Sequence, residues 1–453
     1  MTRTAKKAIV LTPEEKVAQA MVPEADQPYL LPENWRWLYG KSFLCPMETK
    51  RPTGDYFNYI DIDSIDNKRQ TVTAPKHIEV SQAPSRASRA LHSGDTVFSM
   101  VRPYLKNIAF VDESIADSIA STGFYVCKPK ENVAPKYLYY LMVSSYVVDG
   151  LNAYMKGDNS PSIRKEELEQ FPYPIPPLAE QQRIVDRIES LFAKLDEAKE
   201  KAQAVVDGFE ERKAAILYKA FSGELTEQWR RDNIVGLESW QKKTVESICY
   251  SLKYGTAKKS DKMGTVVVIR MGNLQQGEID WTDLAYTKDK DDIEKYRLEP
   301  NDVLFNRTNS AALVGKTSIY RGEHPAIYAG YLIKLDYDHN VVIGDYLNYA
   351  LNTQNAKEYC NTVKTDGVNQ SNINAKKIGA YILPIPSIQE QKRIVELLKG
   401  VIEKEQQAKE AAEKVVDQID TMKKSVLTRA FRGGLGTNDP TDESAEELLK
   451  KIL

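Results

Sequence analysis

The chain repeats itself at a constant offset of 210 residues, and this feature constrains its fold more than any other. Segment 174–225 aligns with segment 384–435 without a gap, and 22 of the 52 positions are identical. The repeat continues upstream in weaker form, where Gly157 and Gly367 keep the same offset. Self-similarity over this length indicates two tandem copies of one structural unit.

Each copy divides into a globular part and a long helix. β-branched and aromatic runs alternate with turn-rich polar stretches in the globular part, which then ends in a proline-punctuated segment. No proline follows for over 40 residues, and the apolar pattern becomes helical. The predicted segments are an N-terminal extension (1–30), a first globular domain (31–173), a first spacer helix (174–223), a second globular domain (224–383), a second spacer helix (384–435) and a C-terminal tail (436–453).

Both helices carry apolar residues in alternating steps of four and three. The 3.5-residue period favours packing of helix on helix, because a helix lying on its own domain shows a wider stripe with a 3.6-residue period. The sequence therefore predicts an α+β fold, in which two mixed α/β domains related by tandem repeat are joined by two long helices that form an antiparallel coiled coil.

Arg212 and Glu405 interrupt the two heptad patterns. The intervening domain can reverse the chain, so we expect antiparallel helices, in which facing residues have numbers with a constant sum. Setting Arg212 opposite Glu405 gives a sum of 617. The alternative is that both side chains lie at the edge of the helix contact, where a solvated pair contributes about 0 to 1 kcal/mol.

Composition excludes some classes of protein and leaves others open. The chain has no apolar run near the roughly 18 residues of a membrane span and no secretory signal before Pro13, so we expect a cytoplasmic protein. The four cysteines are too far apart for a zinc site or a disulfide framework. The net charge of -2 decides nothing about DNA, because acidic helices can offset basic loops.

Motifs that carry catalysis are missing. The sequence has no glycine-rich nucleotide loop, no phosphate loop and no Asp-Pro-Pro-Tyr-like adenine clamp. Its four histidines lack metal-ligand spacing. Asp61, Asp63 and Asp66 fit a turn or a solvated strand face better than a nuclease cluster. We therefore expect no catalytic residue, metal or cofactor on this chain.

Polar and basic loops are the candidates for contact with DNA. Bases are recognised in the major groove by Arg, Lys, Asn, Gln, Ser and Thr side chains, and phosphates by Lys, Arg and backbone donors. The candidates in the first copy are Lys50, Arg51, Arg86, Arg89, Arg102, Lys106 and Asn159. Those in the second copy are Thr256, Lys258, Lys259, Arg270, Asn273, Arg307, Asn309, Ser310, Asn369, Gln370 and Ser371. Gly157 and Gly367, being shared, have the alternative role of structural turns.

The arrangement resembles the specificity subunit of type I restriction-modification systems. The residues that carry the resemblance are the helix starts at 174–184 and 384–394, the Gly157 and Gly367 loops and the two Ala-Phe-x-Gly helix ends. The second copy fits best, through segment 269–274 and Gly315. The first copy departs from the pattern, with Asp61-Ile62-Asp63 in place of the strand that ends in Arg270.

This resemblance implies a non-catalytic subunit whose two target-recognition domains each recognise one half of a split site in double-stranded DNA, with the helices as spacer. It also implies two partner methyltransferase subunits, which use S-adenosylmethionine to methylate adenine N6, and two nuclease-translocase subunits. Three alternatives stay open: a related restriction-modification enzyme without a translocase, an enzyme that modifies or cleaves DNA itself, and a coiled-coil scaffold that binds proteins.

Overall fold

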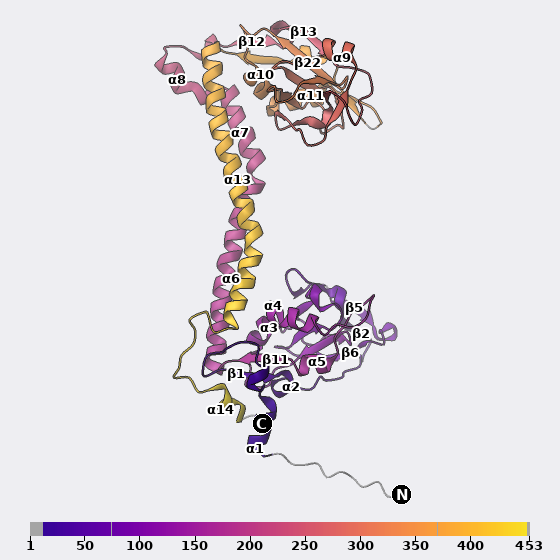
Figure 1. The fold of residues 1–453 in the computed structure, drawn as a ribbon, viewed down its shortest axis with the longest axis vertical. Coiled ribbons are helices and arrows are strands. Elements are labelled where there is room, and N and C mark those ends of the chain that lie inside the picture. The colour runs from indigo at the N-terminus through magenta and orange to yellow at the C-terminus, as the bar shows by residue number, and fades with distance from the viewer. Residues whose placement is uncertain (1–11, 74, 369, 451–453) are drawn as a thin grey trace. The chain divides into compact units, whose positions relative to one another are not determined.

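The computed structural model describes residues 12–73, 75–368 and 370–450. The chain forms two compact units, one made of Met1–Lys201 with Lys414–Leu453 and the other of Ala202–Glu413. The boundary crosses both long helices, so each unit contains one globular domain and one end of the helix pair (Figure 1).

The first globular domain is built on three small sheets and a short two-stranded sheet, β3 (Ile65–Asp66) with β4 (Thr71–Val72). Strands β5-β2-β9-β6 form the largest, in which β2 runs parallel to β9 and antiparallel to β5. Strands β10-β7-β8 form an antiparallel sheet, and β1 pairs with β11 to close the domain. The strands are β1 (Arg36–Tyr39), β2 (Tyr56–Ile60), β5 (Lys76–Glu79), β6 (Ala87–Ala90), β7 (Thr96–Ser99), β8 (Ile108–Phe110), β9 (Ile119–Ser121), β10 (Phe124–Cys127) and β11 (Pro172–Ile175).

The second globular domain repeats this plan. In sheet β17-β14-β21, β14 runs parallel to β21 and antiparallel to β17, as β2 does with its two neighbours. Sheet β13-β22-β18-β20 corresponds to β10-β7-β8, and β12 pairs with β25. The strands are β12 (Gln241–Thr244), β13 (Cys249–Tyr254), β14 (Val266–Ile269), β17 (Ala285–Thr287), β18 (Val303–Asn306), β20 (Thr317–Ile319), β21 (Ala326–Tyr328), β22 (Leu332–Tyr337) and β25 (Ile382–Ile385).

Each domain packs a helix pair against its sheets, α3 (Pro135–Val143) with α4 (Ser145–Asn152) and α10 (Gly344–Leu351) with α11 (Gln354–Val363). The apolar run at 137–148 in the first domain does not form one continuous helix. Ser144 has an extended backbone, and its hydroxyl accepts a hydrogen bond from the N–H of Val147 (3.3 Å), so it ends one helix and caps the next.

The first long helix is interrupted where the sequence predicted it to be continuous. It consists of α6 (Leu178–Asp207) and α7 (Phe209–Phe221), whereas its counterpart α13 (Ile388–Ala430) is unbroken. At the break, the guanidinium of Arg212 folds back over Gly208 and donates to the carbonyl of Val205 (2.8 Å). A Cβ at Gly208 would lie 2.6 Å from Nη1 of Arg212, so glycine leaves room for this bond.

The long helices run antiparallel within each unit, which confirms that part of the predicted fold. In the first unit, Lys199 pairs with Asp420 (3.4 Å) and Asp196 with Lys423 (2.6 Å), so residue numbers rise on one helix as they fall on the other. In the second unit, Nε of Arg212 donates to Oε2 of Glu405 (2.7 Å). This is the pair that the sum of 617 sets opposite each other.

The Glu-Gln pair at each helix start explains part of the repeated motif. The side chain of Gln181 accepts from the N–H of Ala134 (2.7 Å), just before α3, and donates to the carbonyl of Asn132 (3.0 Å). Gln391 accepts from the N–H of Ile343 (3.0 Å), just before α10, and donates to the carbonyl of Val341 (2.9 Å). Each glutamine thereby fixes a globular domain to its own helix.

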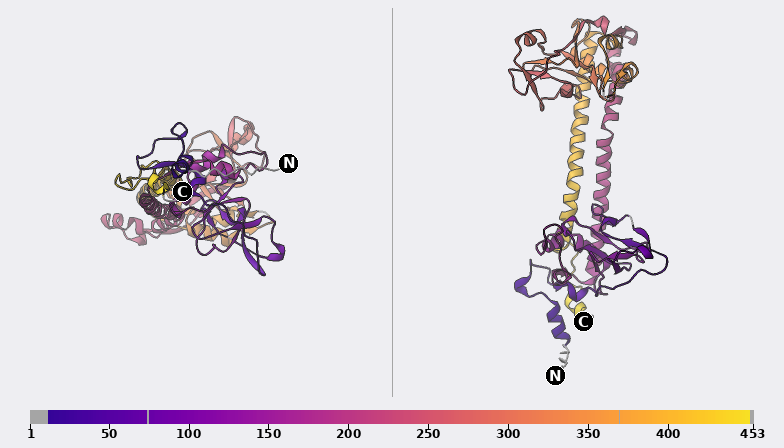
Figure 2. Two further views of the ribbon diagram at one scale, coloured as in Figure 1. Left: turned by 90° about the horizontal axis from the view of Figure 1, so that it is seen from below. Right: turned by 90° about the vertical axis from the view of Figure 1, so that its right-hand side faces the viewer.

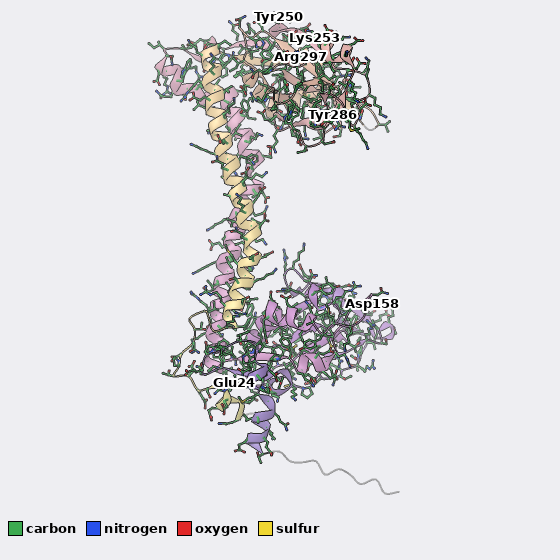
Figure 3. The ribbon with its side chains drawn as sticks, in the orientation of Figure 1. Glu24, Asp158, Tyr250, Lys253, Tyr286 and Arg297 are labelled. Carbon is green, nitrogen blue, oxygen red and sulfur yellow. The ribbon has the colours of Figure 1, made fainter. Side chains whose placement is uncertain are left out.

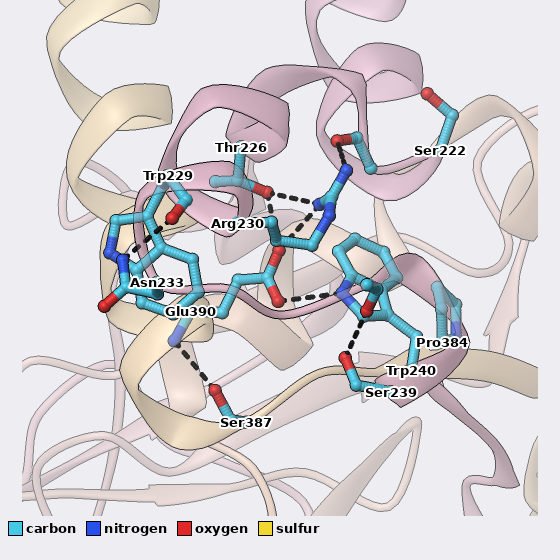
Figure 4. Close-up of polar contacts among 12 residues, drawn as sticks. Ser222, Thr226, Trp229, Arg230, Asn233, Ser239, Trp240, Pro384, Ser387 and Glu390 are labelled. Atoms are coloured by element: carbon cyan, nitrogen blue, oxygen red, sulfur yellow. Dashed lines mark hydrogen bonds and ion pairs between the residues drawn. The ribbon is translucent and has the colours of Figure 1, made fainter.

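The adjacent glutamates are buried and hold the segment that follows the opposite helix. Oε1 of Glu390 accepts from Thr226 (2.8 Å) and from Nη1 of Arg230 (2.7 Å), and Oε2 accepts from Nε1 of Trp240 (2.9 Å) (Figure 4). Thr226 leads into the short helix α8 (Glu227–Asp232). The linker between α7 and β12 is thus pinned to the start of α13.

In the first unit the C-terminal segment takes this place. Oε2 of Glu180 accepts from Nε1 of Trp35 (2.7 Å) and from the amide of Asn438 (2.8 Å), and Oε1 accepts from Thr437 (3.2 Å). Residues 11–12 have the same sequence as residues 225–226, which suggests that Thr12 could take the place of Thr226 in the first unit. Thr12 instead caps the start of the helix Pro13–Ala20. Residue 11 lies outside the described residues.

The described parts of the predicted N-terminal extension and C-terminal tail contribute residues to the first unit's core. Val17 and Ala20 of α1 (Pro13–Ala20) and Leu449 of α14 (Ala445–Lys450) belong to the same buried cluster as Ile184 of α6. The helices α1 and α14 pack beside each other (Figure 2). Neither segment showed a strong enough apolar period in the sequence to predict this packing.

Candidate nucleic-acid interface

Two loops of the first domain lie side by side and bring basic side chains together. The N–H of Lys50 donates to the carbonyl of Ser88 (3.1 Å), and Nη1 of Arg51 donates to the carbonyl of Ser85 (3.3 Å). Four predicted contacts meet here, of which only the last is half-buried: Lys50, Arg51, Arg86 and Arg89.

A second group in the first domain joins the loop after β7 to the Gly157 loop. The N–H of Arg102 donates to the carbonyl of Pro161 (2.8 Å), and its Nη2 donates to the carbonyl of Asn159 (2.6 Å). Both Arg102 and Asn159 are exposed. Neighbouring Asp158 is exposed at the edge of this domain away from the helices (Figure 3).

Lys106 ends the one-turn helix Pro103–Leu105 that begins directly after Arg102. Burial, together with the nearby charge of Lys424 on α13, lowers the pKa of Lys106 below its ordinary value, while Asp149 on α4 opposes the shift. Its backbone is in the left-handed region, with φ of 56°, as is that of Arg102, with φ of 48°. Such conformations are strained for residues other than glycine and are common near binding sites.

In the second domain, the basic loop after β13 is partly neutralised. Nζ of Lys258 lies 2.6 Å from a carboxylate oxygen of Asp289 and 3.3 Å from one of Asp292. The hydrogen bond to Asp289 raises the pKa of Lys258, so the ammonium group stays charged. Its charge is already paired with these carboxylates. Lys259 is exposed and has no ion-pair partner among the described residues, so it is the freer cation of the two.

Arg307 anchors the loops around it. Its Nη2 donates to Oδ1 of Asn372 (3.3 Å), its Nη1 donates to the carbonyl of Gly330 (3.3 Å), and its guanidinium lies 4.7 Å from the centre of the Tyr254 ring. Strand β19 (Thr308–Asn309) beside it pairs with β24 (Ser371–Asn372), the second strand of a hairpin. Arg307 and Arg102 therefore both attach the end of a central strand to a glycine loop.

A cleft of about 340 Å³ brings three further predicted residues together, Arg270, Asn273 and Asn309. Nη2 of Arg270 donates to a carboxylate oxygen of Asp283 (2.9 Å) at its rim. Lys316 lines the same cleft, and sequence reasoning missed it. Its position directly after Gly315, a residue already singled out by the family pattern, was the available signal.

Three predicted contacts are internal to the second domain. Thr256 is 5% exposed and hydrogen-bonds to Asp292, Asn273 is 3% exposed, and Ser371 is 2% exposed and hydrogen-bonds to Asp366. The amide of Asn273 donates to the carbonyls of Asp280 and Asp283, each at 2.9 Å. These side chains hold turns in place and are not free to meet a base. Asn369 lies outside the described residues, and Gln370 and Ser310 are exposed.

Within 12–73, 75–368 and 370–450 there is no group of three or more His, Cys, Asp or Glu residues that could hold a metal ion. In the same part of the chain, no helix has the length and apolar character needed to cross a membrane.

Comparison with known proteins assigns both copies to one family. The family model for the type I restriction modification DNA specificity domain matches residues 43–206 and 238–414. The chain belongs to this family. As a type I specificity subunit it is the component that supplies DNA sequence specificity to a restriction-modification complex, and catalysis lies in the partner subunits.

Individual relatives support the same assignment. The chain is 24% identical over 312 residues to the type I restriction enzyme StySPI specificity subunit of Salmonella potsdam, covering 68% of this chain and 67% of the relative. It is 25% identical over 342 residues to the EcoKI specificity subunit of Escherichia coli K12, covering 72% and 73%. The crystal structure of the HsdS subunit from Thermoanaerobacter tengcongensis matches with a TM-score of 0.70 and 25% identity, covering 90% and 100%.

The structure shows how the two copies differ at the turn where the first departs from the second in sequence. Asp61 follows β2 as Arg270 follows β14, and each precedes a one-turn helix capped three residues later, by Ser64 and Asn273 respectively. Asp61 forms an ion pair with Lys76, where Arg270 pairs with Asp283. The two copies thus place opposite charges on the same turn.

Proposed function

We propose that each recognition domain of this specificity subunit contacts one half of a bipartite site in double-stranded DNA, and that the helix pair sets the spacing of the halves. The observation that carries the proposal is that both domains have the same backbone arrangement but expose different side chains at equivalent positions. The loop after β7 or β18 and the following glycine loop are joined in both domains. Asp158 and Val368, both exposed, follow the two glycines at the shared offset.

The proposed contacts are the predicted residues that reach solvent. Thr256, Asn273 and Ser371 are left out, because their polar groups are bonded inside the domain. The remaining set among the described residues is Lys50, Arg51, Arg86, Arg89, Arg102, Lys106, Asn159, Lys258, Lys259, Arg270, Arg307, Asn309, Ser310 and Gln370. Among these, Arg102 and Arg307 also hold the glycine loops in position through their hydrogen bonds. Asn369 stays a predicted contact outside that part of the chain.

The proposed partners are two methyltransferase subunits that carry S-adenosylmethionine and methylate adenine N6, joined in the full complex by nuclease-translocase subunits, in the cytoplasm. The related chains are named as specificity subunits of type I restriction enzymes, which supports this assembly. A specificity subunit must therefore bind DNA and protein at the same time.

The test is DNA binding by the full chain together with its methyltransferase subunit. We expect tight binding to a duplex that carries both half-sites and a loss of about 4 kcal/mol or more when either half is scrambled, which is the lower end of the usual gap between specific and non-specific binding. Equal binding to all duplexes would contradict the proposal. Methyl transfer by the purified chain alone would show instead that it is itself an enzyme.

A further inference from the structure

The segment that joins β7 to β8 holds two cationic residues in an unfavourable backbone conformation. Arg102 has φ of 48° and Lys106 has φ of 56°, in the left-handed region that residues other than glycine rarely adopt. The N–H of Lys106 donates to the carbonyl of Pro103 (2.9 Å), and its own carbonyl accepts from the N–H of Ile108 (2.8 Å). These hydrogen bonds hold Lys106 in the left-handed conformation.

The equivalent position in the second domain is a glycine. The N–H of the last residue of β7 donates to the carbonyl of Asn107 (3.1 Å), and that of the last residue of β18 donates to the carbonyl of Lys316 (2.8 Å). The residues just before these two acceptors, Lys106 and Gly315, therefore correspond, and Gly315 also has a positive φ, of 95°. Glycine adopts this conformation without steric cost, so the turn alone favours glycine over lysine.

The side chain of Lys106 adds two electrostatic penalties to the backbone strain. It is half-buried, and its ammonium group has no hydrogen-bond or ion-pair partner among the described residues. The charge of Lys424 on α13 lies close to it, while Asp149 on α4 is near but forms no ion pair with it. Burial of an unpaired cation and a neighbouring like charge both destabilise the folded chain.

A phosphate group would remove both electrostatic penalties. Its oxygens accept charge-assisted hydrogen bonds from ammonium groups, and its negative charge offsets the repulsion between Lys106 and Lys424. DNA is the source of phosphate that this part of the domain favours, because Arg102 on the same segment and Asn159 bonded to it are exposed and belong to the proposed DNA contacts.

We propose that Lys106 and Lys424 together bind one phosphate of the DNA backbone, at the junction of the first recognition domain with α13. The inference rests on the DNA binding proposed above, and it adds a contact from the helix pair to those of the recognition domain. A phosphate contact carries no sequence information, so it fixes how the duplex lies against the domain and the helix without selecting bases. It accounts for a lysine where the turn favours glycine.

The test compares Lys106→Ala, Lys424→Ala and the double variant in salt titrations of DNA binding, each as the full chain with its methyltransferase subunit. Each variant should weaken binding to duplexes with and without the half-sites alike. The double variant should reduce the slope of log affinity against log salt by about one unit, because one phosphate contact is lost. A reduction of about two units would mean two separate phosphates and would overturn the shared site, as would unchanged binding by the double variant.

A glycine variant separates the phosphate contact from the fold. Lys106→Gly removes the strained backbone and the like charge, so it should not lower the melting temperature, while its DNA affinity should fall as in Lys106→Ala. The matched control is Gln70→Gly in the same domain, since Gln70 has φ of 57° but no charge. It should leave the salt slope unchanged. A lower melting temperature for Lys106→Gly would show that the lysine serves the fold and would overturn the proposal.

Two further measurements locate and identify the phosphate. One uncharged methylphosphonate linkage, moved along the duplex, should at one position weaken binding by the unaltered chain but not by the double variant, and a scan without such a position would overturn the proposal. Calorimetric binding of inorganic phosphate that the double variant loses, with its DNA affinity unchanged, would identify free phosphate as the ligand instead. An unaltered chain that binds no duplex would overturn the proposed function itself.

Discussion

The two units hold their helix starts with the same glutamate but surround it differently. Within the part of the chain that the structure describes, Glu180 accepts from neutral groups alone, those of Trp35, Thr437 and Asn438. Glu390 accepts from a tryptophan and a threonine as well, but its third donor is the guanidinium of Arg230. Both units therefore keep a buried glutamate that accepts hydrogen bonds at the start of a long helix. The donors to this glutamate differ in residue type, and they come from different parts of the chain.

The two recognition domains also share a backbone arrangement but differ in side chains, at a turn beside the proposed DNA contacts. The turn after the first strand of the parallel pair begins with Asp61 in one domain and Arg270 in the other, and each is held by an opposite charge. A shared turn with reversed charge would let the two proposed readers contact different bases, since carboxylates accept from base amino groups and arginine donates to guanine.

The largest expected effect comes from the difference between the two glutamates. Glu390→Gln leaves the guanidinium of Arg230, which is 8% exposed, buried without its counter-charge, so we expect a loss of about 3 to 5 kcal/mol. Glu180→Gln mismatches neutral donors only and should cost about 1 to 3 kcal/mol. Calorimetric unfolding of both variants measures the difference, and equal losses would show that the Arg230 charge is solvated.

The next comparison is between two adjacent lysines. Lys259→Ala should weaken binding to all DNA sequences alike and reduce the slope of log affinity against log salt by about one unit. Lys258→Ala should change that slope less, because Asp289 and Asp292 already occupy its ammonium group. Salt titrations of both variants decide this. A larger slope change for Lys258 would mean that DNA displaces it from the carboxylates.

Two glycines test why only one long helix is interrupted. Gly400 in α13 has nothing within 4 Å of an added Cβ, so Gly400→Ala should stabilise the chain by about 0.5 to 1 kcal/mol. Gly208→Ala gains the same helix propensity but displaces Arg212, so the net change should be near zero. In an Arg212→Ala background, Gly208→Ala should become stabilising. Thermal melts of the unaltered chain, Gly208→Ala, Arg212→Ala and the double variant form the cycle. If Gly208→Ala changed the stability equally with and without Arg212, the role given to Arg212 would be ruled out.

The smallest effect concerns two half-buried lysines, one in each unit. Burial lowers the pKa of both Lys106 and Lys213, and lysines on α13 add to the shift, Lys424 for the first and Lys409 for the second. Lys424→Ala should raise the pKa of Lys106 without restoring its ordinary value, because the burial remains. NMR titration of labelled lysine measures the pKa, and no change would mean that burial acts alone.

Sequence patterns predicted the arrangement of domains and helices better than the helix break and the roles of single residues. The repeat and the heptads led to the antiparallel helices, and the two residues that interrupt the heptads lie against each other at 2.7 Å. The break at Gly208 could not be predicted, because it depends on the side chain of Arg212 folding back to the carbonyl of Val205, seven residues earlier. Single polar residues such as Thr256 and Asn273 were assigned to DNA by type, but residue type does not distinguish a contact from a turn cap.

The central claim is that each copy of the repeat recognises its own half of the DNA site. Its most direct test is a map of methylated adenines in cells that express the partner subunits with a specificity chain whose residues 241–383 come from a relative. The structure predicts that one half of the methylated motif changes, while the other half and the spacer length stay the same. A motif that changes in both halves, or in neither, would contradict the account.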